Sequence, residues 1–206
     1  MDRESIQNPM HRLILASKSP RRKRILEGAG VSFRIVPADI DESKFDNEGP
    51  RDLVKRLSYE KAKAVKDLLG GNIHSLVLGA DTIVVLGSEI MGKPTNSAHA
   101  EEMLSKLTGN QHKVMTGVSI LNCTSDKMYY RIVTSEVNMR KISLQELQLY
   151  CRSEEVRDKA GAYAIQGRGG AFVKKVIGSE SNVIGLPLDE TLSLLREAGY
   201  FKLDEL

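Results

Sequence analysis

The sequence of 206 residues lacks tryptophan and contains only two cysteines, and aromatic residues make up just 5% of it. Cys123 and Cys151 are far apart and match no metal-binding or redox spacing, so we expect buried, reduced thiols and a reducing compartment. No stretch approaches the roughly 18 apolar residues of a membrane-spanning helix, and residues 1–11 lack the apolar core of a signal peptide. These absences predict a cytoplasmic protein without a membrane partner.

A strong charge of either sign is also absent, because 30 basic side chains oppose 27 acidic ones and leave a formal net charge of +3. This balance argues against a nucleic-acid coat, and we expect no stable nucleic-acid partner. The patterns GxxxxGK[ST] and HExxH are missing, and no GxGxxG follows the first apolar run. Kinase-like, dinucleotide-binding and histidine-metal interpretations are therefore weak.

The pattern of apolar residues predicts an α/β protein, because short apolar runs alternate with segments of helical spacing. With no internal repeat or evident linker, we expect a single domain over residues 12–206, divided into two lobes by a cleft, after a loose extension at residues 1–11. The expected strands are 13–16, 33–37, 76–86, 114–121, 129–140 and 171–176, and the expected helices are 20–28, 51–69, 98–107, 144–151 and 188–198.

Four consecutive cations, at residues 21–24, stand at the start of the first predicted helix, where Ser19 is the expected N-cap. Cations are unfavourable there because the helix N-terminus carries partial positive charge. A bound phosphate would compensate them, since hydroxyls and backbone N–H groups at a helix start bind phosphate oxygens and arginine binds them bidentately. The candidate phosphate ligands are Ser17, Ser19, Arg21 and Arg22, whereas Lys23 and Arg24 are expected to face solvent.

Two charged residues fall where apolar ones are expected. Asp81 shares one side of the strand at residues 76–86 with apolar neighbours, and Lys61 interrupts the apolar stripe of the helix at residues 51–69. A buried carboxylate is costly unless a cation, a metal or hydrogen-bond donors compensate it. Asp81 is therefore either half of a structural ion pair or a site carboxylate, and Lys61 either extends to the rim of the core or projects into a cleft.

Further polar residues follow strands or lie in glycine-rich turns. Glu42 ends an acidic segment at residues 39–42, Lys93 lies in the turn Gly92–Pro94, and Gln166 is surrounded by glycines. An amide can both donate to and accept from a nucleobase. Glu42 and Asp81 are candidate ligands for Mg²⁺ or Mn²⁺, so the residues together suit a metal-bound polyphosphate.

At these residues the sequence resembles the Maf family of nucleotide pyrophosphatases, which are related in fold to inosine triphosphate pyrophosphatases. Segments that resemble the family span nearly the whole chain in the family's order. They are LILASKSPRRKRIL (13–26), DIDE (39–42), RLSYEKA (56–62), LGADTIVV (78–85), GKP (92–94), LTGNQHKVMTGV (107–118), DKAGAYAIQGRGG (158–170) and NVIGLPL (182–188).

The resemblance implies a mixed twisted sheet with flanking helices and a deep cleft, and a hydrolase acting on acid anhydrides. Such an enzyme converts a nucleoside triphosphate to the monophosphate and pyrophosphate with a divalent cation. Asp81 matches the family's proton acceptor, and Glu42, Lys61 and Lys93 match other residues of its catalytic cleft. Arg21, Thr82 and Gln166 match the positions associated with choice of base in the branch that prefers dTTP and UTP.

The resemblance leaves several alternatives open. Asp81 could activate water directly or by holding the metal, and modified pyrimidine nucleotides could be the substrates in a housecleaning role. A non-catalytic nucleotide or nucleic-acid binding regulator of cell division is the competing function, and both a monomer and a homodimer are compatible with the sequence. A binding module alone does not explain Asp81, because a carboxylate repels phosphate unless a metal intervenes.

Overall fold

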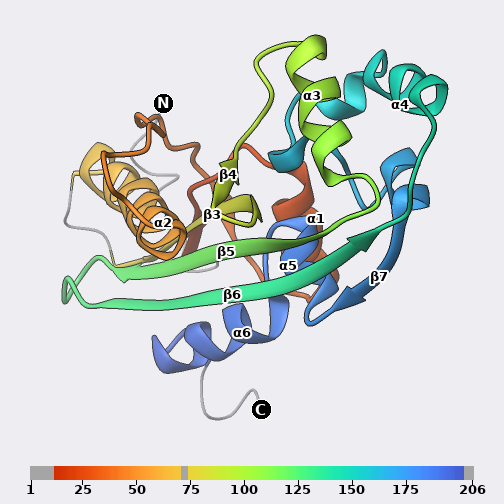
Figure 1. The fold of residues 1–206 in the computed structure, drawn as a ribbon. Coiled ribbons are helices and arrows are strands. Elements are labelled where there is room, and N and C mark those ends of the chain that lie inside the picture. Colours follow the sequence, from red (N-terminus) through yellow and green to blue (C-terminus); the bar gives the residue numbers. More distant parts are fainter. Residues whose placement is uncertain (1–11, 71–73, 202–206) are drawn as a thin grey trace.

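The structure is a computed structural model that describes residues 12–70 and 74–201; the expected N-terminal extension, residues 1–11, lies outside them. Its helices and strands are drawn in Figure 1. The strands are β1 (Leu13–Leu15), β2 (Arg34–Ile35), β3 (Leu76–Leu86), β4 (Glu89–Met91), β5 (Gln111–Asn122), β6 (Met128–Met139) and β7 (Val173–Ile177). The helices are α1 (Pro20–Gly28), α2 (Pro50–Leu68), α3 (Ser97–Leu107), α4 (Leu144–Cys151), α5 (Glu180–Ile184) and α6 (Leu188–Glu197).

The strands form one mixed sheet in the order β2-β1-β3-β5-β6-β7, with β4 paired to β3. The strands β2, β1 and β3 run parallel, whereas β3, β5, β6 and β7 are joined by antiparallel ladders. The α/β class expected from the sequence is confirmed. No helix in the described part of the chain is long and apolar enough to cross a membrane.

The expected long elements are found within a few residues of their predicted bounds, and the errors lie in short ones. The strand expected at 33–37 is only two residues long. The strand expected at 171–176 begins at Val173 because residues 168–172 form a 3₁₀ turn. The sequence interpretation did not identify β4 or α5, since three and five residues are too few to show a period.

Helix α2 lies across one face of the sheet (Figure 1), and two glycines allow its close approach. A Cβ atom on Gly79 of β3 would lie 2.0 Å from the carbonyl oxygen of Ser58, and one on Gly117 of β5 would lie 2.2 Å from that of Val54. Both contacts are with helix backbone, which cannot move aside as a side chain can. The glycines therefore set the distance between α2 and the sheet.

The opposite face of the sheet is covered by α5 and α6, and α1 packs on α5 (Figure 1). Among the described residues, two clusters of buried apolar side chains pack α2 on the sheet, and two others lie near opposite ends of β3. One cluster joins β1 and β3 with α1 and α6, and another joins α3 and α4 with the far ends of β5 and β6. Polar residues between these clusters define the site described below.

Candidate functional site

The site lies beside a gap in the sheet along one edge of β3. On that edge β3 pairs with β1 over Leu76–Leu78 and with β4 over Val84–Leu86. In the described part of the chain no strand covers residues 79–83 between them. Parallel strands deliver ligand sites at their carboxyl ends, and here the end of β1 leads directly into residues 16–19 and α1. Asp81 and Thr82 occupy the uncovered stretch.

A cavity of about 660 Å³ lies at this gap. Its volume is that of a small-molecule site. All ten site residues expected from the sequence line it, namely Ser17, Ser19, Arg21, Arg22, Glu42, Lys61, Asp81, Thr82, Lys93 and Gln166. They come from six separate segments of the chain. The structure thus brings together residues whose proximity the sequence could only suggest.

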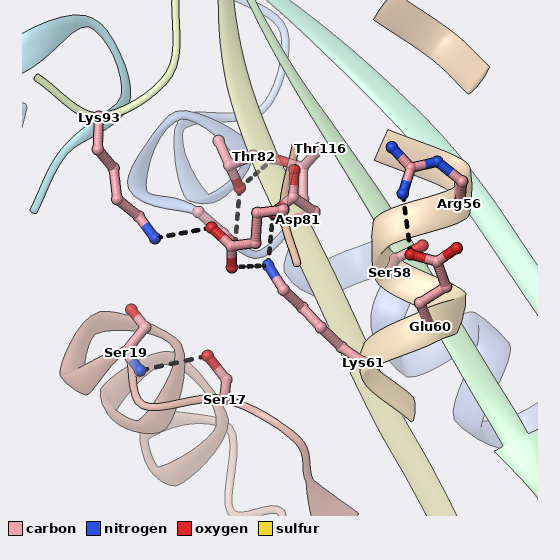
Figure 2. Close-up of polar contacts among 12 residues, drawn as sticks. Ser17, Ser19, Arg56, Ser58, Glu60, Lys61, Asp81, Thr82, Lys93 and Thr116 are labelled. Carbon is pink, nitrogen blue, oxygen red and sulfur yellow. Dashed lines mark hydrogen bonds and ion pairs between the residues drawn. The ribbon is translucent and has the colours of Figure 1, made fainter. Parts of the chain in front are cut away.

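One wall of the cavity contains a chain of alternating charges. Lys61 of α2 donates from Nζ to Oδ1 of Asp81 at 2.6 Å and lies 2.7 Å from Oε1 of Glu42. Lys93 donates to Oε2 of Glu42 at 3.1 Å. Figure 2 shows Lys61 extending from its helix toward Asp81 on β3. Lys61 and Asp81 are each only 7% exposed, so the lysine points into the site and does not reach solvent at the rim of the core.

The charges of the two lysines determine the ionisation of Glu42. Partial burial would raise the pKa of this carboxyl, but hydrogen bonds and charge from Lys61 and Lys93 outweigh it and lower the pKa to about 2. Oδ2 of Asp81 accepts no hydrogen bond from a described residue. It is therefore the carboxylate oxygen of this pair that is available to a ligand or a water.

The segment that carries Glu42 is fastened to α2 by Arg56. Its guanidinium donates to Oε1 and Oε2 of Glu48 at 2.6 and 2.8 Å and to the carbonyl oxygen of Ser43 at 2.9 Å. It also lies 3.9 Å from the ring of Phe45 and pairs with Glu60 (Figure 2). Arg56 stands in the segment RLSYEKA, but nothing in the sequence alone indicated this function.

A second part of the site is built where the start of α1 meets the end of α5. Arg22 donates to the carbonyl oxygen of Gly185 at 2.8 Å, to Oγ of Ser17 at 3.1 Å and to Oγ1 of Thr82 at 3.1 Å. Arg21 donates to the carbonyl oxygen of Ile184 at 3.1 Å. Carbonyls at a helix end lack partners within the helix and carry partial negative charge. The end of α5 therefore compensates part of the charge at residues 21 and 22.

Neither of these two arginines forms an ion pair with a described residue; Asp158 acts on Arg21, and Asp81 and Glu42 act on Arg22, only through longer-range charge interactions. Burial lowers the pKa of the Arg22 guanidinium from its ordinary value, as expected of a desolvated cation. The predicted N-cap is confirmed, since Oγ of Ser19 accepts from the backbone N–H of Arg22. Lys23 and Arg24 are exposed, as expected.

The third part of the site is the loop at residues 163–170, in which Gln166 lines the cavity. The Gln166 side chain is exposed and makes no hydrogen bond with the described residues, which leaves both ends of its amide available. Thr82 lines the same cavity, and its Oγ1 lies 3.0 Å from Oγ1 of Thr116. At the start of the loop, the hydroxyl of Tyr163 lies 2.8 Å from Nε2 of buried His112.

The site offers few ligands to a divalent cation. Among the described residues no group of three or more histidine, cysteine, aspartate or glutamate side chains is arranged to hold a metal. Two carboxylates, those of Glu42 and Asp81, converge on Lys61. Mg²⁺ is usually bound by one or two carboxylates together with substrate phosphates and water. The residues present therefore fit a metal that arrives with a phosphorylated ligand.

The arrangement defines a class: an α/β protein whose cleft gathers cations at a helix start and carboxylates on a strand, suited to a polyphosphate ligand. Comparison with known proteins then gives the family. The family model described as "Maf-like protein" matches residues 12–198. The chain belongs to the Maf family.

Three curated relatives that resemble the chain over nearly its whole length are named dTTP/UTP pyrophosphatase. The Hahella chejuensis protein is 47% identical over 188 residues, which are 91% of this chain and 92% of the relative. The Clostridioides difficile protein is 41% identical, covering 93% and 96% of the two chains. The Vibrio vulnificus protein is 44% identical, covering 91% and 99%.

Proposed function

We propose that this protein hydrolyses dTTP and UTP to the nucleoside monophosphate and pyrophosphate. The observation that carries the proposal is the convergence of Asp81, Glu42, two lysines and two arginines on one cavity. The names of the relatives supply the substrates. The same cavity also provides the exposed amide of Gln166, which suits the edge of a pyrimidine base.

In this proposal the residues of the cavity divide the tasks among them, and Arg21 contributes to both phosphate binding and base selection. Ser17, Ser19 and the start of α1 bind phosphate oxygens, and Arg21 and Arg22 supply positive charge. Oδ2 of Asp81 accepts a proton from water as the water oxygen bonds to the α-phosphorus. The bond from that phosphorus to the bridging oxygen of the pyrophosphate breaks, and Lys61 and Lys93 stabilise the charge that builds on the leaving group. Arg21, Thr82 and Gln166 select the base.

We further propose Mg²⁺ or Mn²⁺ as the cofactor, held by Glu42 and Asp81 together with the substrate. A bound divalent cation would neutralise phosphate charge and lower the pKa of a coordinated water. Lys61 occupies the space between the two carboxylates, so metal binding requires its ammonium group to move toward the phosphates. Residues 12–206 are proposed to form one cytoplasmic domain whose two lobes enclose this cleft.

The test is hydrolysis of a nucleotide panel with Mg²⁺ or Mn²⁺ in water enriched in oxygen-18. We expect pyrophosphate from dTTP and UTP faster than from ATP, GTP and CTP, with the label in the monophosphate because water attacks the α-phosphorus. Label in inorganic phosphate would mean attack at the γ-phosphorus and would contradict the proposal. Modified pyrimidine triphosphates in the same panel identify the preferred substrate.

The competing function, a non-catalytic nucleotide-binding regulator, predicts a different outcome. It requires binding of dTTP or UTP by calorimetry with no release of pyrophosphate under either metal. The enzymatic function is favoured because an uncommitted carboxylate oxygen on Asp81 would only repel a phosphate in a simple binding site.

A further inference from the structure

The loop that presents Gln166 has no ladder of its own to hold it. Residues 163–167 belong to neither a helix nor a strand, and a 3₁₀ turn follows at Arg168–Phe172. Within the loop, the backbone N–H of Gly170 donates to the carbonyl oxygen of Gly167 at 3.1 Å. A loop with so little regular structure needs other groups to fix its backbone.

The side chain of Glu155 supplies acceptors on one side of this loop. Its Oε1 accepts from the backbone N–H of Gly169 at 3.0 Å, and its Oε2 accepts from that of Arg168 at 3.2 Å. Oε1 also accepts from the hydroxyl of Tyr150 at 3.0 Å. Glu155 forms no ion pair with a described residue, so these three donors are its partners.

Tyr150 extends the same support to the other end of the loop. Its hydroxyl accepts from the backbone N–H of Ala164 at 3.1 Å, and its ring is only 2% exposed. The ring packs edge-on against Phe172, with centroids 4.9 Å apart, which fixes its position. Glu155 and Tyr150 thus hold residues 164, 168 and 169, and Gln166 lies between the held points.

The loop also fits closely around these two side chains. A Cβ atom on Gly167 would lie 2.5 Å from Oε1 of Glu155, and one on Gly169 would lie 2.5 Å from the hydroxyl oxygen of Tyr150. Glycine at both positions therefore allows the backbone to close around the carboxylate and the phenol. This explains two of the glycines around Gln166 by contacts outside the base site.

We propose that Glu155 is a positioning residue for base selection, which acts with Tyr150 by fixing the backbone that presents Gln166. The proposal rests on the proposed function, because it assigns base choice to the amide of Gln166. Uracil and thymine each present an N–H donor beside carbonyl acceptors. The amide of Gln166 pairs with the donor and an acceptor at the same time only if its backbone is held in one place.

The decisive variant is Glu155→Gln. Its amide N–H₂ cannot accept from the backbone N–H of Arg168, so one of the hydrogen bonds that the carboxylate accepts is lost. We expect the ratio of kcat/KM for UTP to kcat/KM for ATP to fall about tenfold, the usual effect of losing one hydrogen bond to a charged group. The loss should come from a higher KM for UTP, with kcat within about twofold, because the residues proposed to act on the phosphates are unchanged.

A matched control is the neighbouring residue. Glu154→Gln removes an exposed carboxylate that pairs with Arg157 on the surface, and we expect the base preference to stay unchanged. Tyr150→Phe keeps the packed ring, removes the hydroxyl that contacts both Glu155 and Ala164, and should reproduce the effect of Glu155→Gln. Equal losses of kcat/KM on every nucleotide, in either variant, would overturn the proposal.

A double-mutant cycle distinguishes positioning from general stability. If Glu155 acts through Gln166, the change in base preference caused by Glu155→Gln disappears in a Gln166→Ala background. An undiminished change there would contradict the proposal. Amide hydrogen exchange of residues 163–170 should be faster in Glu155→Gln and unchanged in Glu154→Gln. That measurement needs no turnover, so it tests whether Glu155 fixes the loop backbone even if wild-type protein releases no pyrophosphate and the proposed function fails.

Discussion

The two walls of the cleft, one formed by β3 with α2 and the other by residues 163–170, are built by different means. On the β3 wall, long regular elements pack through Gly79 and Gly117, and the charges of Lys61 and Asp81 are buried between them. On the loop wall, an irregular backbone is held by side chains, and Gln166, the residue proposed to contact the base, is exposed. In the proposed function, the proton acceptor Asp81 therefore lies on a wall fixed by packed regular elements, whereas Gln166 lies on a wall whose backbone is fixed by the side chains of Glu155 and Tyr150.

The largest expected effect tests the chemical role of the β3 wall. We expect Asp81→Asn to lower kcat by about 10²- to 10⁴-fold, the usual contribution of a general base. Asparagine keeps an oxygen that can accept from Lys61, so the fold should survive, which circular dichroism and thermal unfolding can check. Asp67→Asn, on the exposed end of α2 beside Lys63, is the control. Near-normal turnover by Asp81→Asn would remove this carboxylate from the mechanism.

The next effect tests whether the β3 wall is as rigid as the packing implies. Gly79→Ala places a methyl group 2.0 Å from the carbonyl oxygen of Ser58, and overpacking of this kind costs about 3 kcal/mol of unfolding free energy. Urea denaturation provides the measurement. Gly28→Ala is the matched control, because a Cβ atom there has open space. A loss below about 1 kcal/mol for Gly79→Ala would show that α2 can shift and that the wall is not rigid.

A third prediction concerns the charge chain of the β3 wall. Lys61→Met removes one of the two cations that lower the pKa of Glu42 to about 2, so we expect that pKa to rise by at least about one unit. Carbon-13 NMR titration of the side-chain carboxyl measures it directly. Lys63→Met, which removes an exposed lysine two residues further along the same helix, should leave it unchanged. A pKa of Glu42 that stays near 2 in Lys61→Met would mean that Lys61 is not its cause.

The same walls show how far the sequence alone could lead. Asp81 and Lys61 were identified because a charge in an apolar row has a physical cost, and the structure places both in the cavity. The long strand β3 was predicted from its apolar run, and helix α2 from the helical spacing of its apolar residues. Burial and periodicity are local signals, so they were visible before any fold was known.

What the sequence could not predict depends on contacts between distant segments. Arg56 holds the segment at residues 43–48, and Glu155 holds residues 168 and 169, but each looks like an ordinary surface charge in the sequence. The acceptors for Arg21 and Arg22 include the backbone carbonyls of residues 184 and 185, which no side-chain pattern indicates. The expectation of phosphate alone as the partner of the α1 cations was therefore incomplete.

The smallest predicted effect separates the two walls by pH. His112, which contacts Tyr163 at the start of the loop wall, is buried, and this burial lowers its pKa from 6.5 to about 4. Below about pH 6.5, His112 binds a proton in the unfolded chain but not in the folded chain. The free energy of unfolding therefore falls as the pH decreases from 6.5 toward 4. Between about pH 7.5 and 5.5 we expect a loss of about 1 kcal/mol by urea denaturation. Glu42, whose pKa is lowered from 4.5 to about 2, contributes stability that is lost only below about pH 4.5.

His112→Gln should therefore flatten the stability profile between about pH 7.5 and 5.5, whereas His74→Gln, at an exposed position, should retain it. An equal slope in His112→Gln and wild type would show that this histidine is not the acid-sensitive support of the loop wall.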